Sequence, residues 1–316
     1  MSFAYDVKKE LCAKAEIEYT KVRAEYYALL LFCKKFSANK IVFTTEHKYV
    51  ARRFINFSNT LFTPIIERRT NLNAQKSKSA LNTLTFIEPQ ECERIFTSMG
   101  HSERELSLRL NRANIESDEA FAAFVRGAFL ACGSVTDPEK NYHLEFSIPH
   151  KNLSNDLCKL LSEINEFSVA PKVINRNGVY VVYIKDSEEI TDLLTYMGAT
   201  SCAMQIMGTK AMKQVRNNAN RIANSEFANL SKIANASAKH LDAIRVIDST
   251  MGLASLPPEL YAVAMLRNEY PEMSLRDIGA ALDPPISRSG VNHRMEKILA
   301  IAETLKSTQE GGINNA

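Results

Sequence analysis

The chain has 316 residues, of which 45% are hydrophobic, and its formal net charge is only +3, so it is long enough for two domains of ordinary size. The longest wholly apolar run, Tyr26 to Cys33, is far too short to span a bilayer, and the charged N-terminus lacks the apolar core of a secretory signal. Six scattered cysteines without a C-x-x-C pair argue against a zinc site and a disulfide framework, so we expect a cytoplasmic protein with reduced thiols and no metal.

Residues 20–100 form the first of two similar units. The alternating segment "IVFTTEHK" (Ile41–Lys48) leads into a helical pattern, and "FTSMG" (Phe96–Gly100) ends an amphipathic stretch at a glycine. The polar connection "NLNAQKSKS" between two strands is expected to be a mobile loop. The predicted elements are helix Arg23–Phe36, strand Lys40–Thr45, helix His47–Leu61, strands Pro64–Thr70 and Leu81–Ile87, and helix Pro89–Met99.

One stretch of this unit is rich in basic residues. Between Lys48 and Lys78 a single acid, Glu67, stands among the basic residues Lys48, Arg52, Arg53, Arg68, Arg69, Lys76 and Lys78. Such runs are usually solvated surface, but this one favours a polyanion partner because phosphates attract clustered lysine and arginine.

Residues 118–200 repeat the same order of elements. "LEFSIPHK" (Leu144–Lys151) and "LTYMG" (Leu194–Gly198) match the two segments above, and Asn177-Gly178 is a strong hairpin signal. The predicted elements are helix Asp118–Cys132, strand Tyr142–Ile148, helix His150–Asn165, strands Pro171–Asn175 and Val179–Lys185, and helix Ser187–Met197. Two αβαββα units predict an α+β domain with a pseudo-twofold axis over residues 1–205.

The helix Asp118–Cys132 carries small residues that permit close packing. Gly127 and Ala131 lie four apart on one helical face, a pattern that ordinary core packing would also use. The segment "VRGAFLACGSV" (Val125–Val135) resembles the LAGLIDADG helix of homing endonucleases, in which one such helix from each repeat packs at the pseudo-twofold axis.

That resemblance implies a pair of metal-binding acids, which this chain lacks. Homing endonucleases of this type carry an acid just before the glycine that ends each helix, and the two acids hold metal ions for phosphodiester cleavage. Matched on Gly133, the position holds Cys132; in "EYYALLLFCKKFS" the match is Lys34, followed by Lys35 where glycine is expected. Because Mg²⁺ requires oxygen ligands, we expect the scaffold to be kept and cleavage to be lost.

The remainder of the chain is predicted to be helical. We expect a basic linker at residues 206–222, where "GTKAMKQVRNNANR" has four basic residues and no acid. A helical DNA-binding domain is expected at 223–307 and a disordered tail at 308–316.

"SLRDIGAALDPPISRSGVNHRMEKILAIAETL" (Ser274–Leu305) predicts a helix, a turn and a second helix. Ser274 and Asp277 fit a capping box, and Pro284-Pro285 ends the first helix. A helix at Pro257–Tyr270 completes a three-helix unit that resembles region four of bacterial sigma factors.

"LDPPISRSGVNHRMEKI" (Leu282–Ile298), preceded by a degenerate LAGLIDADG-like domain, resembles the WhiA family of bacterial DNA-binding regulators. The resemblance extends over nearly the full chain. It implies a transcriptional regulator linked to cell division, chromosome segregation or sporulation, and therefore an association with the nucleoid.

The helix from about Ser287 to Ala300 would enter the major groove of promoter DNA, with Val291 turned toward the core. The residues expected to contact bases and phosphates are Ser287, Arg288, Ser289, Asn292, His293, Arg294 and Lys297, together with Lys210, Lys213 and Arg216 of the linker. Without a Gly-rich phosphate loop, we expect no nucleotide hydrolysis and no cofactor.

Two alternatives stay open. The first is a surviving homing endonuclease, against which Cys132 and Lys34 argue. The second is that the N-terminal domain is a protein-interaction module for RNA polymerase or a sigma factor.

Overall fold

The computed structural model describes residues 2–72, 80–105 and 107–313, which form two compact units, Met1–Lys213 and Gln214–Ala316. The division falls inside the segment predicted as a basic linker, and that segment is helical. It belongs to helix α8 (Thr200–Met251). None of the helices in the described ranges has both the length and the hydropathy needed to cross a bilayer.

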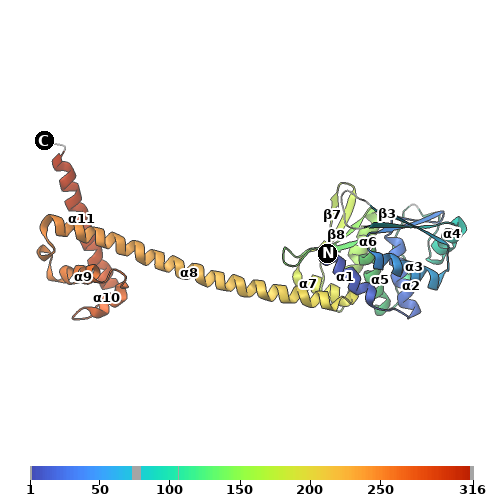
Figure 1. The fold of residues 1–316 in the computed structure, drawn as a ribbon, viewed down its shortest axis with the longest axis horizontal. Coiled ribbons are helices and arrows are strands. Elements are labelled where there is room, and N and C mark those ends of the chain that lie inside the picture. Colours follow the sequence, from blue (N-terminus) through green and yellow to red (C-terminus); the bar gives the residue numbers. More distant parts are fainter. Residues whose placement is uncertain (1, 73–79, 106, 314–316) are drawn as a thin grey trace. The chain divides into compact units, whose positions relative to one another are not determined.

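The first repeat places four strands in one antiparallel sheet (Figure 1). The sheet order is β1-β2-β4-β3, which brings the strand before the connection at residues 73–79 to the edge. The predicted mobile loop falls mostly on residues 73–79, outside the described part of the chain, while Asn71 and Leu72 end a strand. The elements are α2 (Tyr19–Leu31), β1 (Lys35–Ser37), β2 (Lys40–Thr45), α3 (Lys48–Leu61), β3 (Ile66–Leu72), β4 (Ala80–Phe86) and α4 (Pro89–Ser98).

The second repeat has the same topology, with sheet order β5-β6-β8-β7. Asn177 and Gly178 both have positive φ, which confirms the predicted hairpin turn between β7 and β8. The elements are α5 (Asp118–Cys132), β5 (Gly133–Val135), β6 (Leu144–Ile148), α6 (Lys151–Leu161), β7 (Lys172–Arg176), β8 (Val179–Ile184) and α7 (Ser187–Met197).

The α+β class is confirmed, but each repeat is αββαββα and has one strand more than predicted. The extra strands, β1 and β5, are three residues long and follow the first helix of their repeat almost directly. The helix α1 (Phe3–Ala13) was also not predicted; Ser2 caps it. A short helix η1 (Arg112–Asn114) lies in the connection between the repeats.

Helices α2 and α5 pack against each other in the middle of the N-terminal unit. The absence of a side chain at Gly127 permits this contact, because an added Cβ would lie 2.3 Å from the backbone oxygen of Glu25 and 2.9 Å from the Cβ of Ala28. Tyr26, Tyr27 and Leu29 of α2 are fully buried, as expected for a helix that is apolar around most of its circumference.

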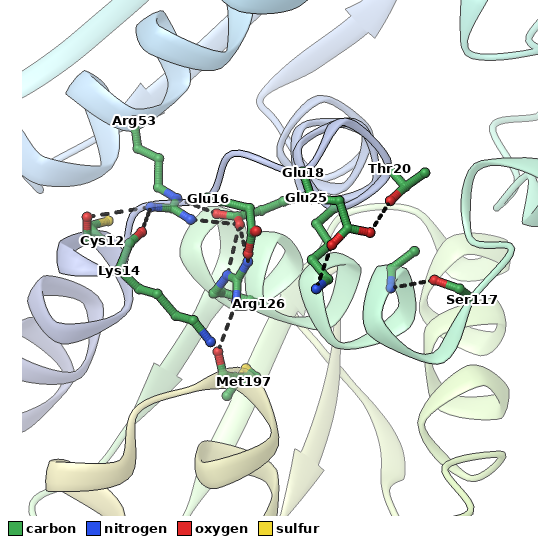
Figure 2. A network of polar contacts seen from close by, with 12 residues as sticks. Cys12, Lys14, Glu16, Glu18, Thr20, Glu25, Arg53, Ser117, Arg126 and Met197 are labelled. Carbon is green, nitrogen blue, oxygen red and sulfur yellow. Dashed lines mark hydrogen bonds and ion pairs between the residues drawn. The ribbon is translucent and has the colours of Figure 1, made fainter.

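A buried ion network joins these two helices to α3 (Figure 2). The carboxylate of Glu25 is inaccessible to solvent and accepts hydrogen bonds from Arg53 (Nη2–Oε2, 2.9 Å) and Arg126 (Nε–Oε2, 2.8 Å). Arg126 also donates to Glu16 at 2.9 Å and to the carbonyl of Met197, so one guanidinium connects α5, the end of α7 and the segment before α2. Full pairing of this kind is what makes buried charge tolerable.

The C-terminal unit is all-helical, and its core is separate from that of the N-terminal unit. Besides the later part of α8 it contains η2 (Leu253–Ser255), α9 (Pro258–Glu269), α10 (Leu275–Ala281) and α11 (Arg288–Ile313) (Figure 1). Since α11 reaches Ile313, the predicted disordered tail is helical from 308 to 313, and residues 314–316 lie outside the described part.

Candidate nucleic-acid interface

The ends of α2 and α5 are the positions at which homing endonucleases carry their acids. The matched segments Ile41–Lys48 and Leu144–Lys151 make Ile41 the equivalent of Leu144. In the sheets, Phe36 pairs with Ile41 and Val135 pairs with Leu144, so Phe36 and Val135 are equivalent as well. Counting back from them makes Cys33, not Lys34, the equivalent of Cys132, a difference of 99 positions. The match to Lys34 was therefore wrong by one residue, because a helix end alone does not fix the register.

Both thiols are held in the neutral form. Burial raises the pKa of Cys33 and of Cys132 to about 12. The Cys33 Sγ donates to the carbonyl of Lys35 at 3.0 Å, and the Cys132 Sγ donates to that of Ala128 at 3.3 Å. A protonated thiol offers a hard cation such as Mg²⁺ no anionic oxygen.

A lysine from α1 lies beside Cys132. Lys8 as a residue is 92% buried, and its ammonium donates to the Leu130 carbonyl at 3.2 Å and lies 5.7 Å from the centroid of the Phe129 ring. It thus supplies a donor to the last turn of α5, where helix carbonyls lack partners. Burial lowers its pKa to about 8.

Lys8 is expected to make the stability of the fold depend on pH. Its pKa is about 8 in the folded chain against an ordinary value of 10.5, so between these values the unfolded chain binds more protons. The free energy of unfolding of the wild type, minus that of Lys8→Met, should therefore increase as pH rises through this window. Urea denaturation from about pH 7.5 to 10 measures the difference, and the exposed Lys9→Met is the control. A flat difference for Lys8→Met would contradict the assignment.

The basic stretch from Lys48 to Lys78 forms a cationic surface only in part: Lys48, Arg52, Arg68 and Arg69 are exposed, and the first three line one pocket. Arg53 is 93% buried and bonded to Glu25, so it cannot contact phosphate. Arg69 pairs with Glu67 at 2.9 Å, and Arg68 donates to Asn82. Lys76 and Lys78 lie outside the described residues.

Two of the three predicted linker contacts are engaged within the N-terminal unit. Lys210 pairs with Glu188 at 2.7 Å, and this hydrogen bond raises its pKa. Lys213 donates to the Pro138 carbonyl at 2.6 Å and lies 5.1 Å from the Tyr142 ring centroid. Arg216, at the start of the C-terminal unit, is exposed.

Helices α10 and α11 form the predicted helix-turn-helix. The Ser274 side chain accepts a hydrogen bond from the backbone N–H of Asp277, which confirms the helix start, and the chain turns through Pro284 and Pro285. Gly279 allows α10 to approach the turn closely, since an added Cβ would lie 2.4 Å from the carbonyl of Ile286. The core is formed by the buried face of α11 against α9 and α10, and includes Val263, Ile278, Val291, Met295 and Ile298.

The predicted site residues of α11 are brought together on its first turns. Ser287 caps the helix by accepting from the Gly290 N–H at 3.2 Å, and its hydroxyl lies 2.9 Å from that of Ser289. Arg294 is partly buried and pairs with Glu259 of α9 at 3.3 Å. Exposed positions are Ser287, Arg288, Ser289, Asn292, His293 and Lys297.

One residue of this face was not among the predicted contacts. Glu296 is exposed and accepts a hydrogen bond from the Asn292 amide, with 2.8 Å between Nδ2 and Oε1. The sequence could have predicted this contact, because Asn292 and Glu296 are four residues apart and side chains at i and i+4 of a helix lie on the same face.

A protein-family model described as the WhiA C-terminal HTH domain matches residues 219–302 of the sequence. A second family model, described as the WhiA LAGLIDADG-like domain, matches residues 121–216. A probable cell division protein WhiA from Clostridium botulinum is 36% identical over 97% of this chain and 99% of its own length. The chain belongs to the WhiA family.

Other WhiA proteins are also similar to this chain over nearly its full length. A probable cell division protein WhiA from Clostridium perfringens is 36% identical, also over 97% of this chain and 99% of its own. The crystal structure of full-length DUF199/WhiA from Thermatoga maritima, 24% identical, covers 96% of this chain and 99% of its own with a TM-score of 0.59, which shows a shared fold. Because the WhiA C-terminal domain is a helix-turn-helix, the chain carries a DNA-binding domain.

Proposed function

We propose that this WhiA-family chain is a sequence-specific regulator of transcription that binds promoter DNA in the nucleoid without cutting it. The observation that carries the proposal is the polar face of α11. Arg288, Asn292 and His293 are exposed together at the start of a helix whose opposite face is locked into the core. Side chains at the start of the second helix of a helix-turn-helix are those that reach base edges.

The absence of cleavage is supported by the ends of α2 and α5. Cys33 and Cys132 occupy equivalent positions and are both neutral. The link to cell division rests on the names of the relatives, which are called probable cell division proteins. RNA polymerase or a sigma factor remains a proposed partner of the N-terminal unit.

The first test is capture of fragmented genomic DNA by the purified chain in Mg²⁺. Both the enriched fragments and any new DNA ends would be sequenced. A shared motif near promoters with intact ends is the expected result. New ends at a fixed site would overturn the absence of cleavage, and no enrichment would overturn DNA recognition.

Single substitutions should separate base contacts from phosphate contacts. Asn292→Ala and His293→Ala are expected to lower the preference for the selected site over random DNA, by about 1–3 kcal/mol for a lost bidentate contact. Arg216→Ala should weaken binding to all sequences alike and lower the salt slope by about one. Titration of both DNAs at several salt concentrations measures these effects, and equal losses on both DNAs for all three variants would contradict the assignment.

A further inference from the structure

The acidic residue on the face of α11 is unexpected for a DNA-binding surface. Arg288, His293 and Lys297 are the kind of side chains that phosphates attract, whereas the carboxylate of Glu296 repels them. A negative charge here lowers the affinity for DNA of every sequence, so the presence of Glu296 on this face calls for a separate role. The structure gives it a hydrogen bond with Asn292 at 2.8 Å.

The chemistry of the amide explains what that bond can do. Asparagine contacts adenine through two atoms: Oδ1 accepts from the N6 amino group and one hydrogen of Nδ2 donates to N7. Nδ2 carries two hydrogens, so the other remains for a neighbouring acceptor. An acceptor that takes the Nδ2 hydrogen pointing away from Oδ1 therefore holds the amide with its oxygen and the other N–H free on the same edge.

We propose that Glu296 is a positioning residue that fixes the Asn292 amide for bidentate recognition of an adenine. The proposal rests on the proposed function and names the base that one residue of that face recognises. Without the carboxylate, the amide can turn about its last bond and exchange its oxygen and nitrogen. A carboxylate only accepts hydrogen bonds, so it selects one of the two orientations, and discrimination follows from that orientation.

The test uses the full chain and the DNA site that it selects from a random pool. Affinity is measured for that site, for versions changed at each base pair, and for random DNA, with the wild type and with Glu296→Ala, Glu296→Gln, Asn292→Ala and the double variant. Glutamine keeps an oxygen that can accept from Asn292 but removes the charge. Glu303→Ala, an exposed acid on the same helix two turns later, is the matched control for charge.

The expected pattern separates the hydrogen bond from the charge. Both Glu296 variants should bind random DNA more tightly. Glu296→Ala should lose at least about fivefold in preference at one A·T pair, the same pair at which Asn292→Ala loses its preference. Glu296→Gln should lose less of that preference than Glu296→Ala, because glutamine still accepts a hydrogen bond but can also donate one and so selects the orientation less strictly. The double variant should be no worse than Asn292→Ala, and Glu303→Ala should keep the full preference.

Three outcomes would overturn the positioning role while leaving the proposed function intact. They are an unchanged preference in Glu296→Ala, an equal loss in the alanine and glutamine variants, and losses at different base pairs for residues 292 and 296. If the wild type selects no motif at all, the proposed function itself fails.

Discussion

Replacing Glu25 with alanine is expected to lower the free energy of unfolding of the N-terminal unit by about 3–5 kcal/mol, the usual cost of removing one partner of a buried ion pair. The change leaves the guanidinium groups of Arg53 and Arg126 buried without their shared carboxylate. Urea denaturation of the full chain measures the loss. Hydrogen exchange of the segment 19–31 assigns it to the N-terminal unit.

The matched control for this prediction is Glu18→Ala. Glu18 forms an ion pair with Lys21 at 2.8 Å, but its side chain is 55% exposed. Water replaces the lost partner there, so stability should hardly change. Equal losses for the two variants would show that the buried network contributes no more than a surface pair.

Gly127→Ala is expected to destabilise the same unit by about 1–3 kcal/mol, a typical cost of overpacking. The new Cβ would lie 2.3 Å from the backbone oxygen of Glu25, which can move only if α2 and α5 separate. Thermal unfolding followed by circular dichroism measures the effect.

Gly208 of helix α8 differs from Gly127 because it has room for a side chain. An added Cβ there meets nothing within 4 Å. Gly208→Ala should therefore stabilise the chain by about 0.5–1 kcal/mol, because alanine loses less backbone freedom than glycine in a helix. If both alanine variants stabilise, the close contact of α2 with α5 does not depend on glycine.

The bounds of a helix were predictable where the sequence contains a capping residue at its N-terminus and a glycine after its C-terminus. Helices α5 and α7 have the predicted bounds, because Ser117 and Asp186 cap their N-termini and a glycine follows each C-terminus. The helix-turn-helix was predictable for the same reason, since a cap and two prolines mark its turn. Strands β1 and β5 were missed because three residues are too few to show an alternating pattern.

Pairings over long separations were not predictable. Arg53 counts as one of seven basic residues in the sequence, and nothing local shows that Glu25 of another helix neutralises it. The same holds for Lys210 and Lys213, whose partners come from the N-terminal unit. The predicted match of Lys34 to Cys132 was wrong by one residue, because only the strand pairing that follows each helix fixes the alignment of the two repeats.

The buried network also bears on how the two repeats depend on each other. With a difference of 99 positions, the equivalent of Glu25 is Phe124 and the equivalent of Arg126 is Tyr27. The fold is nearly symmetric, but the Glu25–Arg126 ion pair is not repeated at the symmetric positions, where the ring centroids of Tyr27 and Phe124 lie 5.8 Å apart. Two copies of the first repeat would place Glu25 opposite a tyrosine, and two copies of the second would place Arg126 opposite a phenylalanine. The ion pair between α2 and α5 therefore forms only between a first and a second repeat, and neither half can replace the other in it.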